Sequence, residues 1–142
     1  MNSSTKPNTL FWIVSVIALI WNVMGVMAYL GQVYMDEATL QDMPVEDQAY
    51  YANVPAWVTA AFAIAVFSGT LGSIAMLLRK KASNPLFVIS LIAVLAQSVY
   101  TFFIQQDIDL AGTRMLWPTL IIAISFFLVY FSRDGVNKGI LI

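Results

Sequence analysis

The sequence predicts an all-α integral membrane protein, built as a bundle of four transmembrane helices with both termini in the cytoplasm. Apolar residues make up 60% of the chain and charged residues only 11%. A water-soluble domain of this size and composition would not have enough polar residues to cover its surface. All charged residues lie outside four apolar windows, 7–35, 48–78, 82–106 and 115–132. Lysine and arginine, moreover, fall almost entirely on one side of the predicted membrane.

Each charge-free window is long enough to cross a bilayer, the last one only just. The hydrocarbon core is about 30 Å thick and takes roughly 20 helical residues at about 1.5 Å of rise each. The first apolar run follows Lys6 as a secretory signal would, but signal cores run only about 7 to 15 residues, so we expect a retained helix. We therefore expect one membrane domain over residues 1–142, with spans 10–30, 56–78, 86–104 and 115–131.

The basic residues set the predicted orientation, because lysine and arginine beside short loops tend to stay cytoplasmic. Lys6 precedes the first span, the run 79–81 joins the second and third, and Arg133 and Lys138 follow the fourth. This places the N-terminus and the C-terminus in the cytoplasm. The opposite side carries seven carboxylates and the single base Arg114, so the outer face is expected to be acidic.

The longest predicted loop, 31–55, lies on this acidic side and carries five carboxylates and no base. Pro44 suits the first turn of a helix and Asn53 suits a helix end, so the loop is expected to be partly helical. Two interpretations remain open. The loop is either a lid or cation-collecting mouth, or simply a solvated acidic segment.

Small residues recur every fourth position in the second span and so share one face of a helix. Such stripes allow close helix packing in membranes. A rougher stripe runs along the first span, at Ser15, Ala18, Asn22 and Gly25. We expect another helix, from this chain or from a second copy, to pack on the stripe of the second span, which is formed by Ala61, Ala65, Gly69 and Ser73.

Asn22 and Gln97 are the most unusual residues within the spans. Each lies 11 or 12 residues from its cytoplasmic entry, which places both roughly 17 Å deep. An unpaired amide in hydrocarbon costs several kcal/mol, so each needs a partner or water. Either the two amides bond to each other and join helices, or they line a partly hydrated pocket with Trp21 and Ser98 that binds the hydroxyls of a neutral solute.

A weak internal repeat supports the pocket interpretation. Shifting the sequence by 75 residues aligns 13–18 with 88–93, and Asn22 with Gln97. Both copies would enter the membrane from the same side. This gives the parallel two-plus-two arrangement found in some transporters.

Several kinds of chemistry are not expected. The chain has no cysteine and no histidine, which leaves only carboxylates as strong metal ligands, and none of these lies in a span. There is no nucleophile paired with a base and no phosphate-binding glycine loop. We therefore predict no enzymatic activity, no catalytic residues, no bound metal and no cofactor. Topology accounts for the basic residues, so the expected contact is the lipid bilayer and not nucleic acid.

Three segments, 21–29, 53–57 and 77–87, together resemble a group of small four-helix bacterial inner-membrane proteins that carry the label of sugar transporters. They read Trp-Asn-Val-Met-Gly-Val-Met-Ala-Tyr, Asn-Val-Pro-Ala-Trp, and Leu-Leu-Arg-Lys-Lys followed by Pro-Leu-Phe. The resemblance covers most of the chain. It implies a multi-pass protein of the bacterial inner membrane with a role in transport, and it carries over no particular binding residue.

The sequence therefore leaves two functions open. The first is a permease for a small neutral solute such as a sugar, working as a homo-oligomer because four helices enclose little space. The second is a non-catalytic accessory or assembly subunit of a larger membrane complex, which needs only packing stripes and a receptive outer loop.

Overall fold

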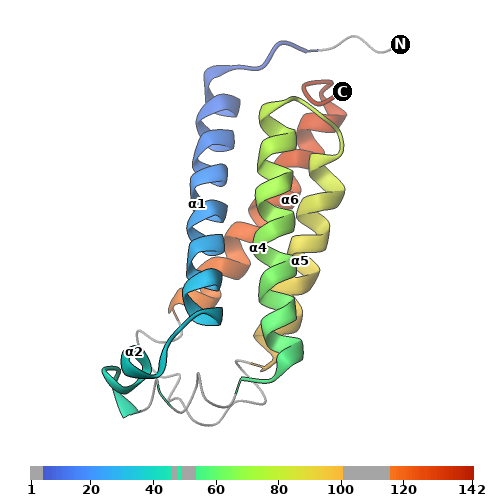
Figure 1. Ribbon diagram of the computed structural model, residues 1–142. Helices are drawn as coiled ribbons and strands as arrows, with labels where there is room; N and C mark the ends of the chain where they lie inside the picture. The colour runs from blue at the N-terminus through green and yellow to red at the C-terminus, as the bar shows by residue number, and fades with distance from the viewer. Residues whose placement is uncertain (1–4, 46–47, 49–53, 101–115) are drawn as a thin grey trace.

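The computed structural model describes residues 5–45, 48, 54–100 and 116–142, and the fold of this part of the chain is all-α (Figure 1). Three long apolar helices could cross a membrane by length and composition, and a shorter apolar helix lies beside them. The long helices are α1 (Thr9–Val33), α4 (Ala56–Leu77) and α6 (Leu116–Asn137), and the shorter one is α5 (Ser83–Val99).

Helix α4 is the centre of the bundle. It packs against α1 on one side and α5 on the other, and α6 packs on α5. In the most apolar window of each long helix, 44% of the residues of α4 are buried inside the protein, against 22% in α1 and 17% in α6. The apolar residues left exposed on α1 and α6 form a surface suited to lipid.

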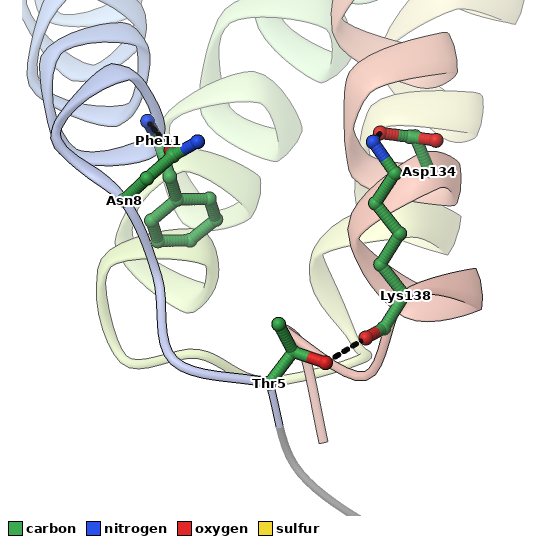
Figure 2. Close-up of polar contacts among 5 residues, drawn as sticks. All are labelled: Thr5, Asn8, Phe11, Asp134 and Lys138. Atoms are coloured by element: carbon green, nitrogen blue, oxygen red, sulfur yellow. Dashed lines mark hydrogen bonds and ion pairs between the residues drawn. The ribbon is translucent and has the colours of Figure 1, made fainter.

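Helix α1 begins as the sequence predicts, within one residue. Asn8 is its N-cap, and the side-chain oxygen of Asn8 accepts a hydrogen bond from the N–H of Phe11 at 2.9 Å (Figure 2). This bond satisfies one of the N–H groups that a helix start leaves without an internal partner. At its other end α1 continues to Val33, three residues past the predicted boundary.

Two other helices extend beyond the predicted spans. Helix α5 begins at Ser83 and not at Leu86, because Pro85 is tolerated inside the first turn, where its missing N–H is not needed. Helix α6 ends at Asn137 and not at Phe131. Loss of hydrophobicity marks the end of the membrane-embedded part, whereas the backbone hydrogen bonds of α6 continue for six further residues. Residues 101–104 and 115 of the predicted spans lie outside the described residues.

Both α4 and α6 end in the same capping motif. In each, the N–H three residues beyond the last helical residue bonds back to a carbonyl five positions earlier, Lys80 to Ala75 at 2.8 Å and Ile140 to Gly135 at 2.9 Å. This motif requires a left-handed residue, normally glycine. Gly139 fills that position after α6 with φ 78°, but Arg79 fills it after α4 with φ 57°.

The Arg79 side chain joins three separate parts of the chain. Its Nε donates to the carbonyl of Ile140 at 3.0 Å, and its Nη2 donates to the carbonyl of Thr5 at 3.0 Å. The Arg79 carbonyl in turn accepts from the N–H of Ile142 at 2.9 Å. The N-terminal segment, the α4–α5 turn and the C-terminal tail therefore meet at one end of the bundle (Figure 1).

Further contacts bind the two ends of the chain together. Thr5 donates its hydroxyl to the carbonyl of Lys138, and Lys138 forms an ion pair with Asp134 at 3.0 Å (Figure 2). Beneath them lies an apolar cluster of buried side chains, namely Phe11, Ala18, Met76, Phe87, Leu128 and Leu141. We call this end, with Lys6, Arg79, Lys80, Lys81, Arg133 and Lys138, the basic end.

The opposite end carries the short helix α2 (Glu37–Gln41) within the predicted acidic loop. The Asp36 carboxylate caps it by accepting the N–H of Thr39 at 2.8 Å. The N–H of Gln48 bonds to the carbonyl of Pro44 at 3.0 Å, as in a helical turn. The predictions for this side also included Glu46, Asp47, Asn53, Asp107, Asp109 and Arg114, which lie outside the described residues.

Candidate functional site

The Asn22 amide lies between two helices near the middle of α1. It is buried, with 8% of its surface exposed. Its Nδ2 donates to the carbonyl of Ala18 at 2.9 Å in its own helix and to the hydroxyl of Ser73 on α4 at 3.3 Å. Both N–H groups of the amide are thus engaged, one with Ala18 on α1 and one with Ser73 on α4.

Gly69 allows this close approach between α1 and α4. A Cβ atom built on Gly69 would lie 2.1 Å from Oδ1 of Asn22 and 3.2 Å from Oγ of Ser90 on α5. Only a residue without a side chain leaves room for both groups. The hydroxyl of Ser90 donates to the carbonyl of Ala65 at 2.7 Å, so polar side chains from α1 and α5 converge on the same face of α4.

That face is the small-residue stripe described in the sequence. The structure buries all of its members between neighbouring helices, and Ser73 is completely inaccessible. On α1, the residues buried in the structure likewise include Ser15, Ala18 and Asn22. The stripe of α4 comprises Ala61, Ala65, Gly69 and Ser73, and helices of the same chain cover it.

A cavity of about 280 Å³ lies beside this polar junction. All four apolar helices contribute to its wall, which is largely apolar and carries no charged side chain among the residues that line it. Its lining residues are Trp21, Asn22, Met24, Gly25 and Ala28 from α1; Phe62, Ala65 and Val66 from α4; Ser90, Val94 and Gln97 from α5; and Ile121 and Ser125 from α6.

The structure brings three of the four candidate polar residues to this cavity, namely Trp21, Asn22 and Gln97. The fourth, Ser98, turns its hydroxyl back onto its own helix and donates to the carbonyl of Val94 at 2.8 Å. The cavity also contains Ser90 and Ser125, which the sequence did not single out as site residues. Serine is common in membrane helices as a packing residue, so neither position carried a distinguishing signal.

A second, smaller cavity of about 190 Å³ lies at the acidic end. It is formed where α1 ends, α2 turns and α4 begins, and it is lined by Gln32, Val33, Met35, Leu40, Val54 and Thr59. The neighbouring Asp36 caps α2, and the hydrogen bonds of its carboxylate, first with the side chain and then with the backbone of Thr39, lower the pKa of Asp36 below its ordinary value. Asp36 thus serves local structure.

The described residues contain no group of three or more histidine, cysteine, aspartate or glutamate side chains that could hold a metal ion. Comparison with known proteins adds no independent assignment. No protein-family model, curated protein or solved structure matches this chain. The chemistry of the larger cavity is therefore the basis for a functional proposal.

Proposed function

We propose that this small multi-pass membrane protein is a permease of the bacterial inner membrane, and that the 280 Å³ cavity between its four apolar helices binds the transported solute. One observation carries the proposal: amide and hydroxyl groups buried among apolar helices converge on a space that is not filled by side chains. Polar groups at this depth are costly unless paired, so in membrane proteins they often mark a pathway or a binding site.

The cavity favours a small neutral solute. No charged side chain lines it, so an ion would lose its hydration without compensation. Its volume lies just below the range of roughly 300 to 1,000 Å³ that is typical of sites for drug-sized ligands. A sugar is the weaker candidate within this class, because its hydroxyls point in all directions whereas most of the wall is apolar.

The same-side cluster of basic residues supports the proposed orientation. The N-terminal segment, the α4–α5 turn and the C-terminal tail all lie at the basic end (Figure 1). Short basic loops are retained in the cytoplasm. We therefore place the basic end in the cytoplasm and the α2 end outside it, with α5 completing a fourth crossing.

The first test asks what surrounds the protein in its own membrane. A tagged chain is extracted gently, and the intact complex is weighed by native mass spectrometry with its bound molecules. A homo-oligomer that retains a small neutral molecule supports the permease. Recovery at fixed stoichiometry with larger foreign subunits would instead make this chain an accessory or assembly subunit and would rule out the proposal.

The second test uses a pair of matched variants in proteoliposomes loaded with a panel of neutral solutes. Ala28 lines the cavity, and Ala123 is an exposed residue of α6 away from it. Ala28→Leu should reduce the uptake rate of the transported solute, while Ala123→Leu should leave it unchanged. Equal uptake by both variants would show that the solute does not pass through the cavity.

A further inference from the structure

The cavity lies where two of the described helices, α1 and α6, are not closely packed. Helix α1 packs on α4, α4 on α5 and α5 on α6, but no comparable set of contacts joins α1 to α6 in the described part of the chain. These two helices meet near the basic end, where the rings of Phe11 and Phe131 stack with their centroids 6.1 Å apart. We call the line along which α1 faces α6 the α1–α6 seam.

Residues on both sides of this seam line the cavity and are also exposed at the surface. On α1, Met24 is 60% exposed and Ala28 is exposed as well. On α6, Ile121 is 36% exposed. All three are apolar and lie within helices suited to the bilayer core, where the surrounding solvent is acyl chain and not water. An opening at this seam therefore faces lipid.

Three of the polar side chains in the wall, Asn22, Ser90 and Ser125, offer acceptors. Both N–H groups of Asn22 are donated to Ala18 and Ser73. The hydroxyl hydrogens of Ser90 and Ser125 are donated to backbone carbonyls, at 2.7 Å and 2.8 Å respectively. Each of these side chains retains an oxygen with acceptor capacity. A ligand that matches these three side chains brings hydrogen-bond donors on an otherwise apolar body.

We propose that the cavity takes a small uncharged amphiphile directly from the lipid phase through the α1–α6 seam. The ligand carries one or two hydroxyl or N–H donors and is too small to be a phospholipid. The proposal rests on the cavity being the solute site of the proposed permease. It narrows the solute class from neutral molecules in general to those that dissolve in the membrane.

Two photoactivatable probes test this proposal in phosphatidylcholine proteoliposomes. One is a diazirine analogue of 1-hexanol, and the other is a diazirine analogue of a hexose. Labelled residues are identified by mass spectrometry. The hexanol probe should label residues that line the cavity, such as Met24 and Ile121, and the labelling should saturate. Excess hexanol should protect these positions better than hexane, which has no donor.

Matched variants separate binding in the cavity from general contact with lipid. Ala28→Leu should lower the saturable labelling about tenfold or more, the size of effect expected when one apolar group is misplaced in a pocket. Ala123→Leu should not change it. Ala28 is exposed, so its replacement is expected to fold, and the melting temperature of each variant checks this.

Three outcomes would overturn the proposal, and they differ in whether the proposed permease function is retained. If labelling never saturates and is equal at Met24 and at the exposed Ile17, the probe only contacts these residues from the lipid and does not bind in the cavity. Saturable labelling by the hexose probe alone would reject entry from lipid but leave the permease in place. If neither probe gives saturable labelling, the proposal that the cavity binds an amphiphile is rejected. Uptake measurements would then decide separately whether the protein transports a solute.

Discussion

At the scale of single residues, Gly69 is a point where three helices approach closely. An added methyl group would lie 2.1 Å from Oδ1 of Asn22, far inside contact distance. We expect Gly69→Ala to lower the free energy of unfolding by roughly 1 to 3 kcal/mol, the usual cost of overpacking. Reversible unfolding in mixed micelles measures this change in the free energy of unfolding.

The matched control for this substitution is Gly31→Ala. Gly31 lies on α1, and an added Cβ there meets no atom within 4 Å. Its effect should therefore stay within about 0.5 kcal/mol, as for most surface substitutions. If the two variants were equally stable, Gly69 would not be a point of close approach.

Arg79 combines a strained backbone with a structural side chain. A non-glycine residue with φ 57° costs about 1 to 2 kcal/mol of backbone strain. Arg79→Gly and Arg79→Ala both lose the bonds to Thr5 and Ile140, but only the glycine variant relieves the strain. We expect Arg79→Ala to be less stable than Arg79→Gly by about 1 kcal/mol in the same unfolding experiment. The reverse order would contradict the left-handed conformation.

Asp36 makes the cap of α2 dependent on pH. The hydrogen bonds with Thr39 lower the pKa of the folded carboxyl below its ordinary value of 3.8. The cap therefore stabilises α2 fully above that ordinary value, and the stabilisation is lost as the pH falls through the folded pKa. The protection of the Thr39 amide, its exchange rate compared with that of an unstructured peptide at the same pH, should decrease on acidification. Asp36→Asn should remove this dependence, since the amide accepts a hydrogen bond but does not titrate, and a variant with unchanged pH dependence would exclude Asp36 as the titrating group.

The candidate site could be predicted only in part from the sequence. Asn22 stands out because an amide within an apolar run needs a partner. Ser73 could not be identified as that partner, because the rotation and depth of two helices decide which side chains meet, and periodicity fixes neither. The cavity itself is a property of four helices together, so no single segment indicates it.

At the scale of elements, the helices are joined by a few polar bonds placed among apolar contacts. Asn84, in the first turn of α5, donates to the carbonyl of Val129 at 3.2 Å and to the hydroxyl of Ser132 on α6 at 3.0 Å. Removing both bonds by Asn84→Ala should lower stability by about 1 to 2 kcal/mol.

The control for Asn84 is Asn137→Ala, an exposed asparagine at the end of α6. Loss of the Asn137 side chain should change the free energy of unfolding by less than about 0.5 kcal/mol. A similar cost at both positions would mean that the α5–α6 bonds add nothing beyond a general effect of replacing asparagine.

The elements themselves were more predictable than the site. Windows without charge locate three long helices because burying charge in lipid is costly, and this signal persists over some twenty residues. Helix ends were harder. At the end of α6 the polar residues Arg133 and Asp134 continue the helix beyond the apolar run, since leaving the hydrocarbon core removes the need for apolar side chains but not the backbone hydrogen bonds.

At the scale of the whole molecule, the arrangement is polarised. The basic end gathers the N-terminal segment, the α4–α5 turn and the C-terminal tail, and Arg79 bonds to two of these segments at once. The other end holds α2 with its capping carboxylate. The intervening helices are apolar, and α4 lies at their centre. This distribution of charge fits a protein that crosses the membrane with both ends on one side.

The most direct test of that central claim is the accessibility of single cysteines, for which a chain without native cysteine is well suited. Lys80→Cys, Lys138→Cys and Asp42→Cys are exposed to a membrane-impermeant maleimide in sealed right-side-out and inverted vesicles. We predict that Lys80→Cys and Lys138→Cys react only in inverted vesicles, and Asp42→Cys only in right-side-out ones. Reaction of Lys80→Cys and Lys138→Cys from opposite sides, or of all three from the same side, would contradict the account.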